Sequence, residues 1–352
     1  MRLTKGTCCI SSEDGVVKVE YLFSVDAGGS KTLALLTTFD LELISVSKAG
    51  PMNVLENGEK VVRKNLKRLT KMFERVPKGS LVRSCFGMPA LGEFQDSESY
   101  LKKIIVEEIG LEPELVVNDV VMGWAAGTVG KDGVHVVAGT GTMAYGRRGS
   151  QECRSGGWGS LIGDEGSAYD IGRETLRRVC RQIDGREPET LLKDFVMGKL
   201  RFQNWWELSN WVYSKPFSKR RPIIAAVARL TNEAAQLGDE VALEILSNAG
   251  REIALCVLAV ARRLNLEAPL VSYSGGVLLE NRFVRNEFER FIVETVPNAQ
   301  IQQAVFHPVV GGLVLLLKRL KVDIDEFVMK KLKSISDHCQ KVEKGAVLSG
   351  EA

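Results

Sequence analysis

Apolar residues in the first part of the chain gather in short runs that are separated by small and polar residues. The run Val19–Val25 ends in the turn Asp26–Thr32 (DAGGSKT), and two more runs follow at Leu33–Phe39 and Leu43–Val46. Connections this short have no room for a crossover helix, so the pattern predicts three antiparallel strands.

A similar pattern returns near the middle of the chain. Val134–Ala138 and Met143–Tyr145 read as strands, and the turn Gly139–Thr142 joins them. Strand, small-residue turn and strand thus open both halves. This weak internal duplication predicts a protein with two similar sheets and a ligand cleft between two lobes.

Helical and strand patterns alternate between and after these two openings. Apolar positions spaced by three or four residues predict helices, and short buried runs predict strands. The predicted helices are Glu56–Arg75, a helix opened by Asp96-Ser97, Ser167–Ile183, Pro188–Leu200, Asn204–Tyr213, Pro222–Leu237, Asp239–Leu264, Phe283–Val296 and Val309–Leu320. The further strands are Leu81–Phe86, Leu115–Val117, Pro269–Tyr273 and Ala299–Gln303.

These elements predict an α/β protein with two domains and two end segments. We expect an N-terminal extension at 1–18 and a small N-terminal domain at 19–122, completed by a C-terminal helix at about 308–335. A larger domain would span 123–307, and residues 340–352 read as a polar, disordered tail.

Composition narrows the class of protein. The 352 residues are 45% hydrophobic and 26% charged, with a net charge of only +3, which is typical of a globular chain and not of a nucleic-acid binder. The basic run Lys219-Arg220-Arg221 reads as a solvated helix end. Because we find neither a spanning apolar stretch nor a secretory signal, we expect a soluble cytoplasmic protein without a membrane partner.

The cysteines and histidines do not suggest a metal framework. Seven cysteines, none of them in a C-x-x-C pair, indicate reduced thiols, and three scattered histidines lack the H-E-x-x-H spacing of zinc hydrolases.

Three turns place glycines and hydroxyls at the ends of predicted strands: Asp26–Thr32, Gly139–Thr142 and Ser274–Gly276. Glycine lets the backbone approach an anion closely, and clustered N–H groups can grip a polyphosphate. Asp26 could hold Mg²⁺ beside it, because hard cations prefer oxygen ligands. Each turn alone is more often an ordinary β-turn, and the chain has no Walker A or dinucleotide fingerprint.

Five motifs in order give the turns a more specific meaning. They are V-D-A-G-G-S-K-T (Val25–Thr32), V-N-D (Val117–Asp119), A-G-T-G-T (Ala138–Thr142), G-G-W-G-x-x-x-G-D-E-G-S-A (Gly156–Ala168) and S-G-G-V (Ser274–Val277). This set resembles the BadF/BadG/BcrA/BcrD ATPase family and its N-acetylglucosamine kinase branch. The resemblance covers about residues 20–320, and the G-D-E-G-S-A segment is its most specific part.

The resemblance implies a two-lobed actin-like ATPase fold with duplicated ribonuclease H-like domains, the fold of the actin, hexokinase and Hsp70 superfamily. It implies an ATP-dependent, Mg²⁺-assisted kinase acting on a hydroxyl, the 6-OH, of a hexose or N-acetylhexosamine such as glucose or N-acetylglucosamine. A homodimer is also expected. It implies that Asp26–Thr32 is a first phosphate loop, Gly139–Thr142 a second phosphate loop, and Ser274–Gly276 a turn against adenosine. The implied nucleotide contacts are Gly28, Gly29, Ser30, Lys31, Thr32, Gly139, Thr140, Gly141, Thr142, Gly275 and Gly276, with Asp26 at the metal. The implied sugar contacts are Asn53, Gly157, Trp158, Asp164 and Asp119, and Asp119 is also the implied catalytic base.

Each of these side chains also has an ordinary structural interpretation. Asp119 could be a turn or cap aspartate, although a carboxylate at a strand end can also take a proton from an attacking hydroxyl. Asp164 and Glu165 could complement a helix N-terminus, Asn53 could serve a turn, and Trp158 could be core. Trp205, Trp206 and Trp211 read as packing between helices.

One position departs from the family pattern. The N-acetylglucosamine kinases carry an asparagine shortly after the second phosphate loop, where this chain has Met143. The missing amide weakens the case for strict N-acetyl specificity. The alternative function is a regulatory ATPase that activates a dehydratase or reductase, but such activators need paired cysteines at an iron–sulfur cluster. A sugar-responsive regulator of the ROK type would need a DNA-binding domain that 18 residues cannot supply.

Overall fold

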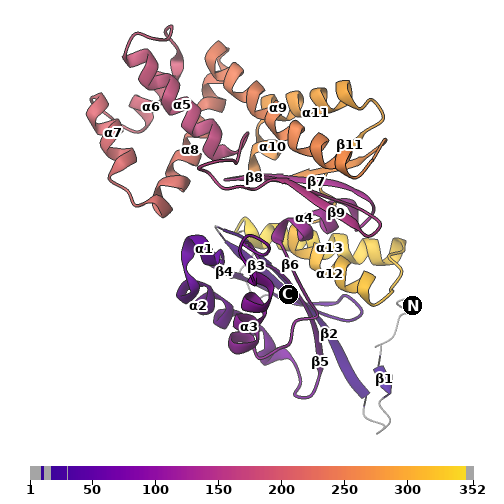
Figure 1. Ribbon diagram of the computed structural model, residues 1–352. Helices are drawn as coiled ribbons and strands as arrows, with labels where there is room; N and C mark the ends of the chain where they lie inside the picture. The colour runs from indigo at the N-terminus through magenta and orange to yellow at the C-terminus, as the bar shows by residue number, and fades with distance from the viewer. Residues whose placement is uncertain (1–8, 12–16, 30, 346–352) are drawn as a thin grey trace. The chain divides into compact units, whose positions relative to one another are not determined.

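The computed structural model describes residues 9–11, 17–29 and 31–345 (Figure 1). The predicted site residue Ser30, most of the extension 1–18 and the last residues 346–352 lie outside the described part. The chain divides into two compact units, one made of residues 1–131 and 304–352 and the other of residues 132–303. The first unit is therefore built from both ends of the chain.

The sheet of the first unit has the strand order β4-β3-β2-β5-β6, and β1 pairs with β2. Strand β3 runs antiparallel to both of its neighbours, β2 and β4, as predicted, whereas β5 and β6 run parallel to β2. The strands are β1 (Cys9–Ser11), β2 (Val17–Ala27), β3 (Thr32–Thr38), β4 (Leu43–Ala49), β5 (Leu81–Gly87) and β6 (Leu115–Val117).

Alternate residues of β2 face different layers, because successive side chains of a strand point to opposite faces. Phe23 and Val25 join a buried cluster with residues of the helices on one face. Those helices are α1 (Val54–Asn57), α2 (Glu59–Leu69), the 3-10 helix η1 (Thr70–Arg75) and α3 (Ser97–Ile109). The Ser24 hydroxyl faces α12 (Pro308–Arg319) and donates a hydrogen bond to the Val309 carbonyl at 2.6 Å.

Helix α12 also packs tightly against α4 (Asp119–Thr128). A Cβ atom at Gly311 would lie 2.0 Å from the Met122 carbonyl oxygen, so only glycine fits between the two backbones. This contact places all of α4 in the first unit. The boundary expected after residue 122 therefore lies after Lys131, and the chain returns to the first unit at Ala304.

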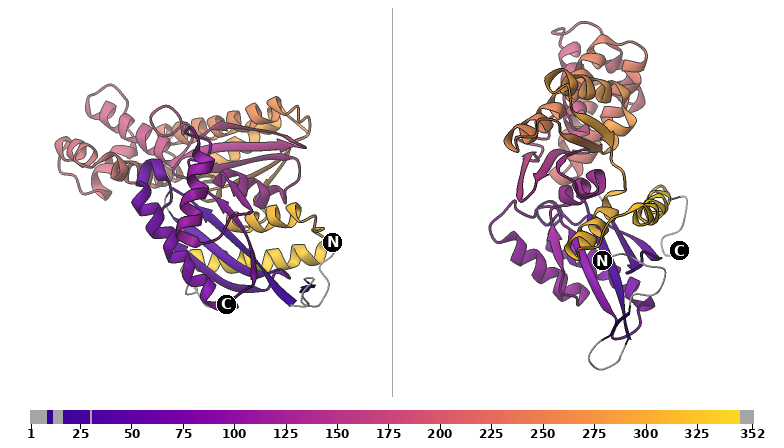
Figure 2. Two further views of the ribbon diagram at one scale, coloured as in Figure 1. Left: turned by 60° about the horizontal axis from the view of Figure 1, so that its bottom comes forward. Right: turned by 90° about the vertical axis from the view of Figure 1, so that its right-hand side faces the viewer.

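The chain continues into a further long helix, α13 (Glu326–Glu343), which lies beside the strands of the first unit in both views of Figure 2. The expected helix at about 308–335 is thus two helices. The expected polar tail from residue 340 is wrong for its first residues, because the buried side chains of α13 recur at helical spacing up to its last turn. These are Val328, Leu332, Ile335, Cys339 and Val342.

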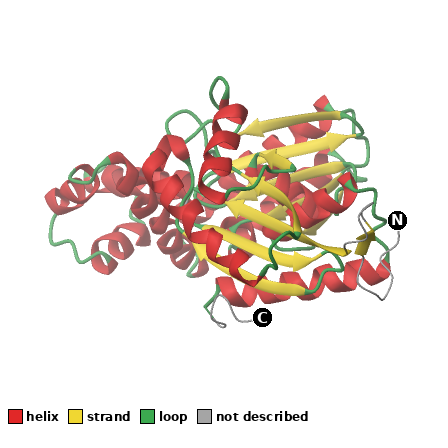
Figure 3. Ribbon diagram, turned by 90° about the horizontal axis from the view of Figure 1, so that it is seen from below, coloured by secondary structure: helices red, strands yellow, loops and turns green. Residues whose placement is uncertain are grey.

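The sheet of the second unit has the order β11-β10-β7-β8-β9, so it repeats the strand order of the first sheet. Three antiparallel strands again lead to two strands parallel to the first, which confirms the duplication. Figure 3 shows the strands in yellow among the helices. The strands are β7 (Gly133–Ala138), β8 (Thr142–Arg148), β9 (Gln151–Gly156), β10 (Leu270–Ser274) and β11 (Gln300–Gln303). Strand β9 was not predicted, because its residues are mostly polar.

Helices make up most of the rest of the second unit, and α9 packs on β7, β8 and β9. The helices are α5 (Ala168–Ile183), α6 (Leu191–Lys199), α7 (Trp205–Tyr213), α8 (Phe217–Gln236), α9 (Glu240–Arg263), α10 (Gly276–Glu280) and α11 (Arg282–Thr295). Pro222 lies inside α8 instead of opening it. Trp205 and Trp206 do not pack between helices: their rings stack on each other with 48% and 62% of their surfaces exposed.

Among the described residues, the longest helices are too polar to cross a membrane.

Candidate active site

Two aspartates lie at the carboxyl ends of neighbouring strands in the first unit. In the register of the sheet, Asp26 of β2 and Val117 of β6 both pair with Gly87 of the intervening strand β5. Asp119 follows Val117 by two residues, so both carboxylates belong to the same edge of the sheet. This is the edge at which ligands bind in open α/β sheets.

Their surroundings disfavour ionisation. Burial, together with the negative charges of Asp26 and, more weakly, Glu93, raises the pKa of Asp119 to about 7. Burial also raises the pKa of Asp26 to about 6, against the opposing effect of His307. A carboxyl group with a pKa near neutrality is well suited to accept a proton at physiological pH.

The start of α4 fixes the position of Asp119. Asn118 is the N-cap: its side-chain oxygen accepts from the Val120 N–H at 3.1 Å, and its amide donates to the Leu91 carbonyl at 3.0 Å. Asp119 accepts from the same Val120 N–H through Oδ1 at 3.0 Å. The N-cap interpretation therefore belongs to Asn118, and Asp119 occupies the first helical position beside the sheet edge.

The first glycine turn closes on itself and is anchored to a second turn. The Gly28 N–H donates to the Lys31 carbonyl at 2.9 Å, and the Thr32 hydroxyl donates to the Gly50 carbonyl at 2.8 Å. The Met52 N–H returns to the Gly28 carbonyl at 3.1 Å. These bonds place the turn that carries Asn53 directly beside the predicted phosphate loop.

Asn53 has the structural role that its turn suggested. Its side-chain oxygen caps α1 by accepting from the Leu55 and Glu56 N–H groups at 3.0 and 3.3 Å. The predicted contact of Asn53 with a sugar stays a prediction, and its side-chain NH₂ is the group that could make it.

Lys31 in the first turn forms an ion pair with the last residue of α13. Its ammonium lies 2.7 Å from one carboxylate oxygen of Glu343, and the other oxygen of Glu343 lies 3.5 Å from His307 Nε2. The hydrogen bond with His307, aided by Lys31, lowers the pKa of Glu343 to about 2. Glu343 and His307 are thus charged or polar neighbours of Asp26 that the sequence did not reveal.

The second glycine turn lies in the second unit and is also closed. The Gly139 N–H donates to the Gly141 carbonyl at 2.9 Å, and the Ala168 N–H donates to the Gly139 carbonyl at 2.8 Å. The Thr142 hydroxyl is buried and finds no hydrogen-bond partner within the described part of the chain. A buried hydroxyl without a protein partner leaves a hydrogen bond for an ordered water or a polar ligand group.

Asp164 lies directly over this second turn. Its Oδ1 accepts from the Thr142 N–H at 3.2 Å, and its Oδ2 accepts from Arg221 Nη2 at 2.7 Å. Burial raises the pKa of Asp164, and the charge of Arg221 opposes that rise. Arg221 is therefore not part of a solvated helix end, as its basic run suggested, because its side chain is only 18% exposed in this ion pair.

The third turn joins the second one at the sheet edge. Gly275 has φ = 92°, and a Cβ atom there would lie 2.2 Å from the Ala138 carbonyl oxygen, so only glycine is accommodated. Gly276 follows as the exposed first residue of α10. The predicted adenosine turn and the predicted phosphate loop thus have their backbones in contact within the second unit.

Two further predicted sugar residues lie in the glycine-rich loop after β9. Trp158 is 64% exposed, which excludes the core interpretation, and the Arg154 guanidinium lies 5.3 Å from its ring centroid. A Cβ atom at Gly157 would lie 2.0 Å from Met143 Cε. The methionine that replaces the family's asparagine therefore lies against a predicted sugar residue.

Known proteins of similar sequence and fold define the class. The chain is 30% identical over 291 residues to the N-acetylmuramic acid/N-acetylglucosamine kinase of Clostridium acetobutylicum, covering 80% of this chain and 94% of that protein. It is 28% identical over 321 residues to the N-acetyl-D-glucosamine kinase of Dictyostelium discoideum, covering 86% and 99% of the two chains. The class is that of ATP-dependent sugar kinases.

The fold agrees with this class. The crystal structure of a candidate N-acetylglucosamine kinase from Chromobacterium violaceum matches with a TM-score of 0.64 at 20% identity, over 84% of this chain and 98% of that chain. The fold is the actin-like fold of sugar kinases. The model of the BadF/BadG/BcrA/BcrD ATPase family matches residues 24–315, and the chain belongs to that family.

Proposed function

We propose that this protein transfers the γ-phosphate of ATP to the 6-OH of a hexose or N-acetylhexosamine, with Asp119 as the general base. The observation that carries the proposal is the carboxylate of Asp119 at the carboxyl edge of the sheet, with a pKa raised to about 7. A group with this pKa is ionised for much of the time at neutral pH and still binds a proton well.

In the proposed reaction the sugar hydroxyl attacks the γ-phosphorus of ATP. A new bond forms between the sugar oxygen and phosphorus, and the bond between phosphorus and the β,γ-bridging oxygen breaks, so that ADP leaves. The hydroxyl proton passes to a carboxylate oxygen of Asp119. Most of the catalysis in such a transfer comes from positioning and electrostatic stabilisation, to which the two glycine turns and the Thr142 hydroxyl would contribute.

Asp26 fits the expected magnesium ion. Two half-buried carboxylates at one sheet edge repel each other, as the raised pKa of Asp119 indicates, and a divalent cation would relieve that repulsion. Mg²⁺ is commonly held by one or two carboxylates together with substrate phosphates. Bound there, it would neutralise charge on the transferred phosphoryl group.

Two observations bear on the identity of the acceptor sugar. The kinases of Clostridium and Dictyostelium are named for N-acetylated sugars, which favours such an acceptor here. Met143, in contact with Gly157, offers a thioether where the family has an amide, which favours a broader range that includes glucose. A homodimer is part of the proposal as well.

A coupled ADP-release assay tests the proposal. The assay covers glucose, mannose, glucosamine, N-acetylglucosamine and N-acetylmannosamine, with and without Mg²⁺, and the position of the phosphate on the product is identified by NMR. We expect sugar-dependent ADP release and a 6-phosphate product. ATP hydrolysis that no sugar accelerates would contradict the proposal and favour a regulatory ATPase.

A further inference from the structure

A buried ion pair links α8 to the predicted sugar site of the second unit. Arg221 lies near the start of α8, and its Nη2 donates to Asp164 at 2.7 Å, while Asp164 itself is only 4% exposed. Breaking a buried pair of this kind by removing one partner leaves the other charge without compensation. Asp164 therefore depends on Arg221 to remain ionised in this surrounding.

The place of Arg221 is set by close packing between α5 and α8. A Cβ atom at Gly172 of α5 would lie 2.0 Å from the Ile224 carbonyl oxygen of α8, one turn after Arg221. The hydroxyls of Thr175 and Thr231 join the two helices again at 2.6 Å. The close backbone approach and this hydrogen bond together define the position of α8 on α5.

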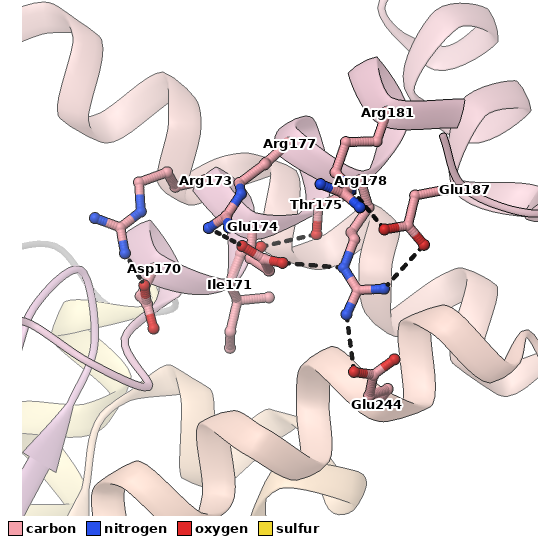
Figure 4. A network of polar contacts seen from close by, with 10 residues as sticks. All are labelled: Asp170, Ile171, Arg173, Glu174, Thr175, Arg177, Arg178, Arg181, Glu187 and Glu244. Atoms are coloured by element: carbon pink, nitrogen blue, oxygen red, sulfur yellow. Dashed lines mark hydrogen bonds and ion pairs between the residues drawn. The ribbon is translucent and has the colours of Figure 1, made fainter. Parts of the chain in front are cut away.

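Helix α5 is fixed in turn by ion pairs on another side. Arg178 of α5 contacts Glu174 at 3.0 Å, Glu187 at 3.3 Å and Glu244 of α9 at 2.8 Å (Figure 4). A series of contacts therefore runs from α9 through α5 to α8, and the guanidinium of Arg221 lies at its end. A side chain carried by such a support is well positioned to orient a neighbouring group.

The same ion pair forms one wall of the second glycine turn. A Cβ atom at Gly141 would lie 2.7 Å from Arg221 Nη2 and 2.8 Å from Asp164 Oδ1. The pair therefore touches the backbone of the predicted phosphate loop. A carboxylate has about four acceptor positions, and the Thr142 N–H and Arg221 take two of them, which leaves acceptor capacity for ligand hydroxyls.

We propose that Arg221 is a positioning residue that keeps the carboxylate of Asp164 ionised and oriented to accept hydrogen bonds from two sugar hydroxyls. This inference rests on the proposed sugar kinase function. It assigns to the helical part of the second unit a role in acceptor binding that acts through Asp164 and not through direct contact.

Calorimetric binding of the best sugar, measured without ATP at pH 6 and pH 8.5, tests the inference. Arg221→Met should weaken sugar binding about 10- to 100-fold, which is the size expected when a buried charged hydrogen bond is lost. The loss should be larger at pH 6, because Asp164 without its cation takes up a proton more readily. Arg221→Lys should recover part of the affinity. Arg220→Met is the matched control, because Arg220 bonds to the Lys215 carbonyl and lies over Tyr213 instead. The affinity of this variant for the sugar should be unchanged.

A purely structural role of Arg221 would give a different pattern of binding affinities. In that case Arg221→Met would weaken the binding of ATP and of sugar equally, with the same loss at both pH values, and the inference would be wrong. Asp164→Asn combined with Arg221→Met should cost little more than Asp164→Asn alone, whereas additive losses would also overturn the inference. This comparison also serves if Arg221→Met alone folds poorly. Both proteins in it carry Asp164→Asn, so the ion pair is already broken in each of them. A wild-type protein that binds no sugar would overturn the proposed function itself.

Discussion

At the residue scale, the proposed chemistry depends on a few charged groups, some at an edge of the first sheet and others at an edge of the second. Asp119 and Asp26 could be found from the sequence, because each closely follows a short apolar run. Arg221 and Glu343 could not, because their partners Asp164 and Lys31 lie far away in the chain and no local spacing links them. The sequence shows which residues carry charge, and only the fold shows which charges meet.

Asp119→Asn should remove catalysis while sparing binding. The amide keeps the shape of the side chain and can still contact a hydroxyl, but it cannot take the proton. We expect kcat to fall about 10²–10⁴-fold with little change in KM for sugar or ATP. Steady-state kinetics measures this. Asp26→Asn is the comparison, because it should instead weaken the Mg²⁺ dependence. The base assignment fails if the Asp119→Asn variant keeps more than about a tenth of the wild-type kcat.

The raised pKa of Asp119 also predicts how rate and stability depend on pH. The base must be ionised, so kcat/KM should fall about tenfold per pH unit below an apparent pKa near 7. In the folded protein this carboxyl holds its proton more tightly than in the unfolded chain. Its ionisation therefore costs stability, and the cost grows as pH rises from about 4 to 7.

Asp119→Asn should accordingly raise the free energy of unfolding by roughly 1–3 kcal/mol at pH 8 and by almost nothing at pH 4. Denaturant titrations of both proteins at the two pH values measure the difference. An equal change at both pH values would show that the carboxyl has an ordinary pKa.

Met143 leads to a prediction about acceptor choice. Strong rejection of a wrong substrate usually requires a buried polar group that the wrong substrate leaves without a partner. A thioether supplies no such group, so kcat/KM for glucose and for N-acetylglucosamine should differ by less than about a hundredfold. Met143→Asn should increase the preference for the N-acetylated sugar. Strict use of N-acetylglucosamine by the wild-type protein would contradict this prediction.

At the element scale, the strands with apolar runs and the long helices could be predicted from periodicity. Strand β9 could not, because its polar residues give no hydrophobic alternation. The end of α13 was missed for another reason: its polar composition after Cys339 suggested a tail, yet one apolar residue, Val342, continues the buried stripe. A single residue at the right spacing is enough to extend a helix when a core is there to receive it.

Val342→Ala should therefore destabilise the first unit. The side chain is fully buried, and the loss of two methyl groups with the resulting cavity should cost about 1.5–3 kcal/mol. Because Glu343 follows Val342, we also expect a weaker ion pair between Glu343 and Lys31 and a higher KM for ATP. Thermal unfolding and kinetics measure both effects. The exposed neighbour provides the control, since Lys341→Ala should change neither. Equal stability of the two variants would show that the last turn of α13 contributes little.

At the scale of the whole molecule, one unit is continuous in sequence and the other is not. Residues 132–303 contain a complete sheet with its helices. Residues 1–131 lack α12 and α13, so one face of their sheet, around Ser24, would be open to water.

We expect a fragment of residues 132–303 to fold by itself and to unfold cooperatively. A fragment of residues 1–131 should fold only when residues 304–352 are supplied, for example by co-expression. Circular dichroism and denaturant titration of the separate fragments measure this. A stably folded fragment 1–131 would show that α12 and α13 are accessory to the first sheet.

The return of the chain to the first unit also sets an order of events on the ribosome. Domains commonly fold in the order in which they are synthesised. Here the segments that carry Asp26 and Asp119 are made first but must wait for α12, so the second unit can fold before the first. The contact between Lys31 and Glu343 can form only after residue 343 has been translated. The proposed first phosphate loop is thus among the earliest segments to be made, yet its ion pair with α13 must wait for the far end of residues 304–345. An interrupted translation product would carry a folded second unit and an unfinished edge of the first sheet.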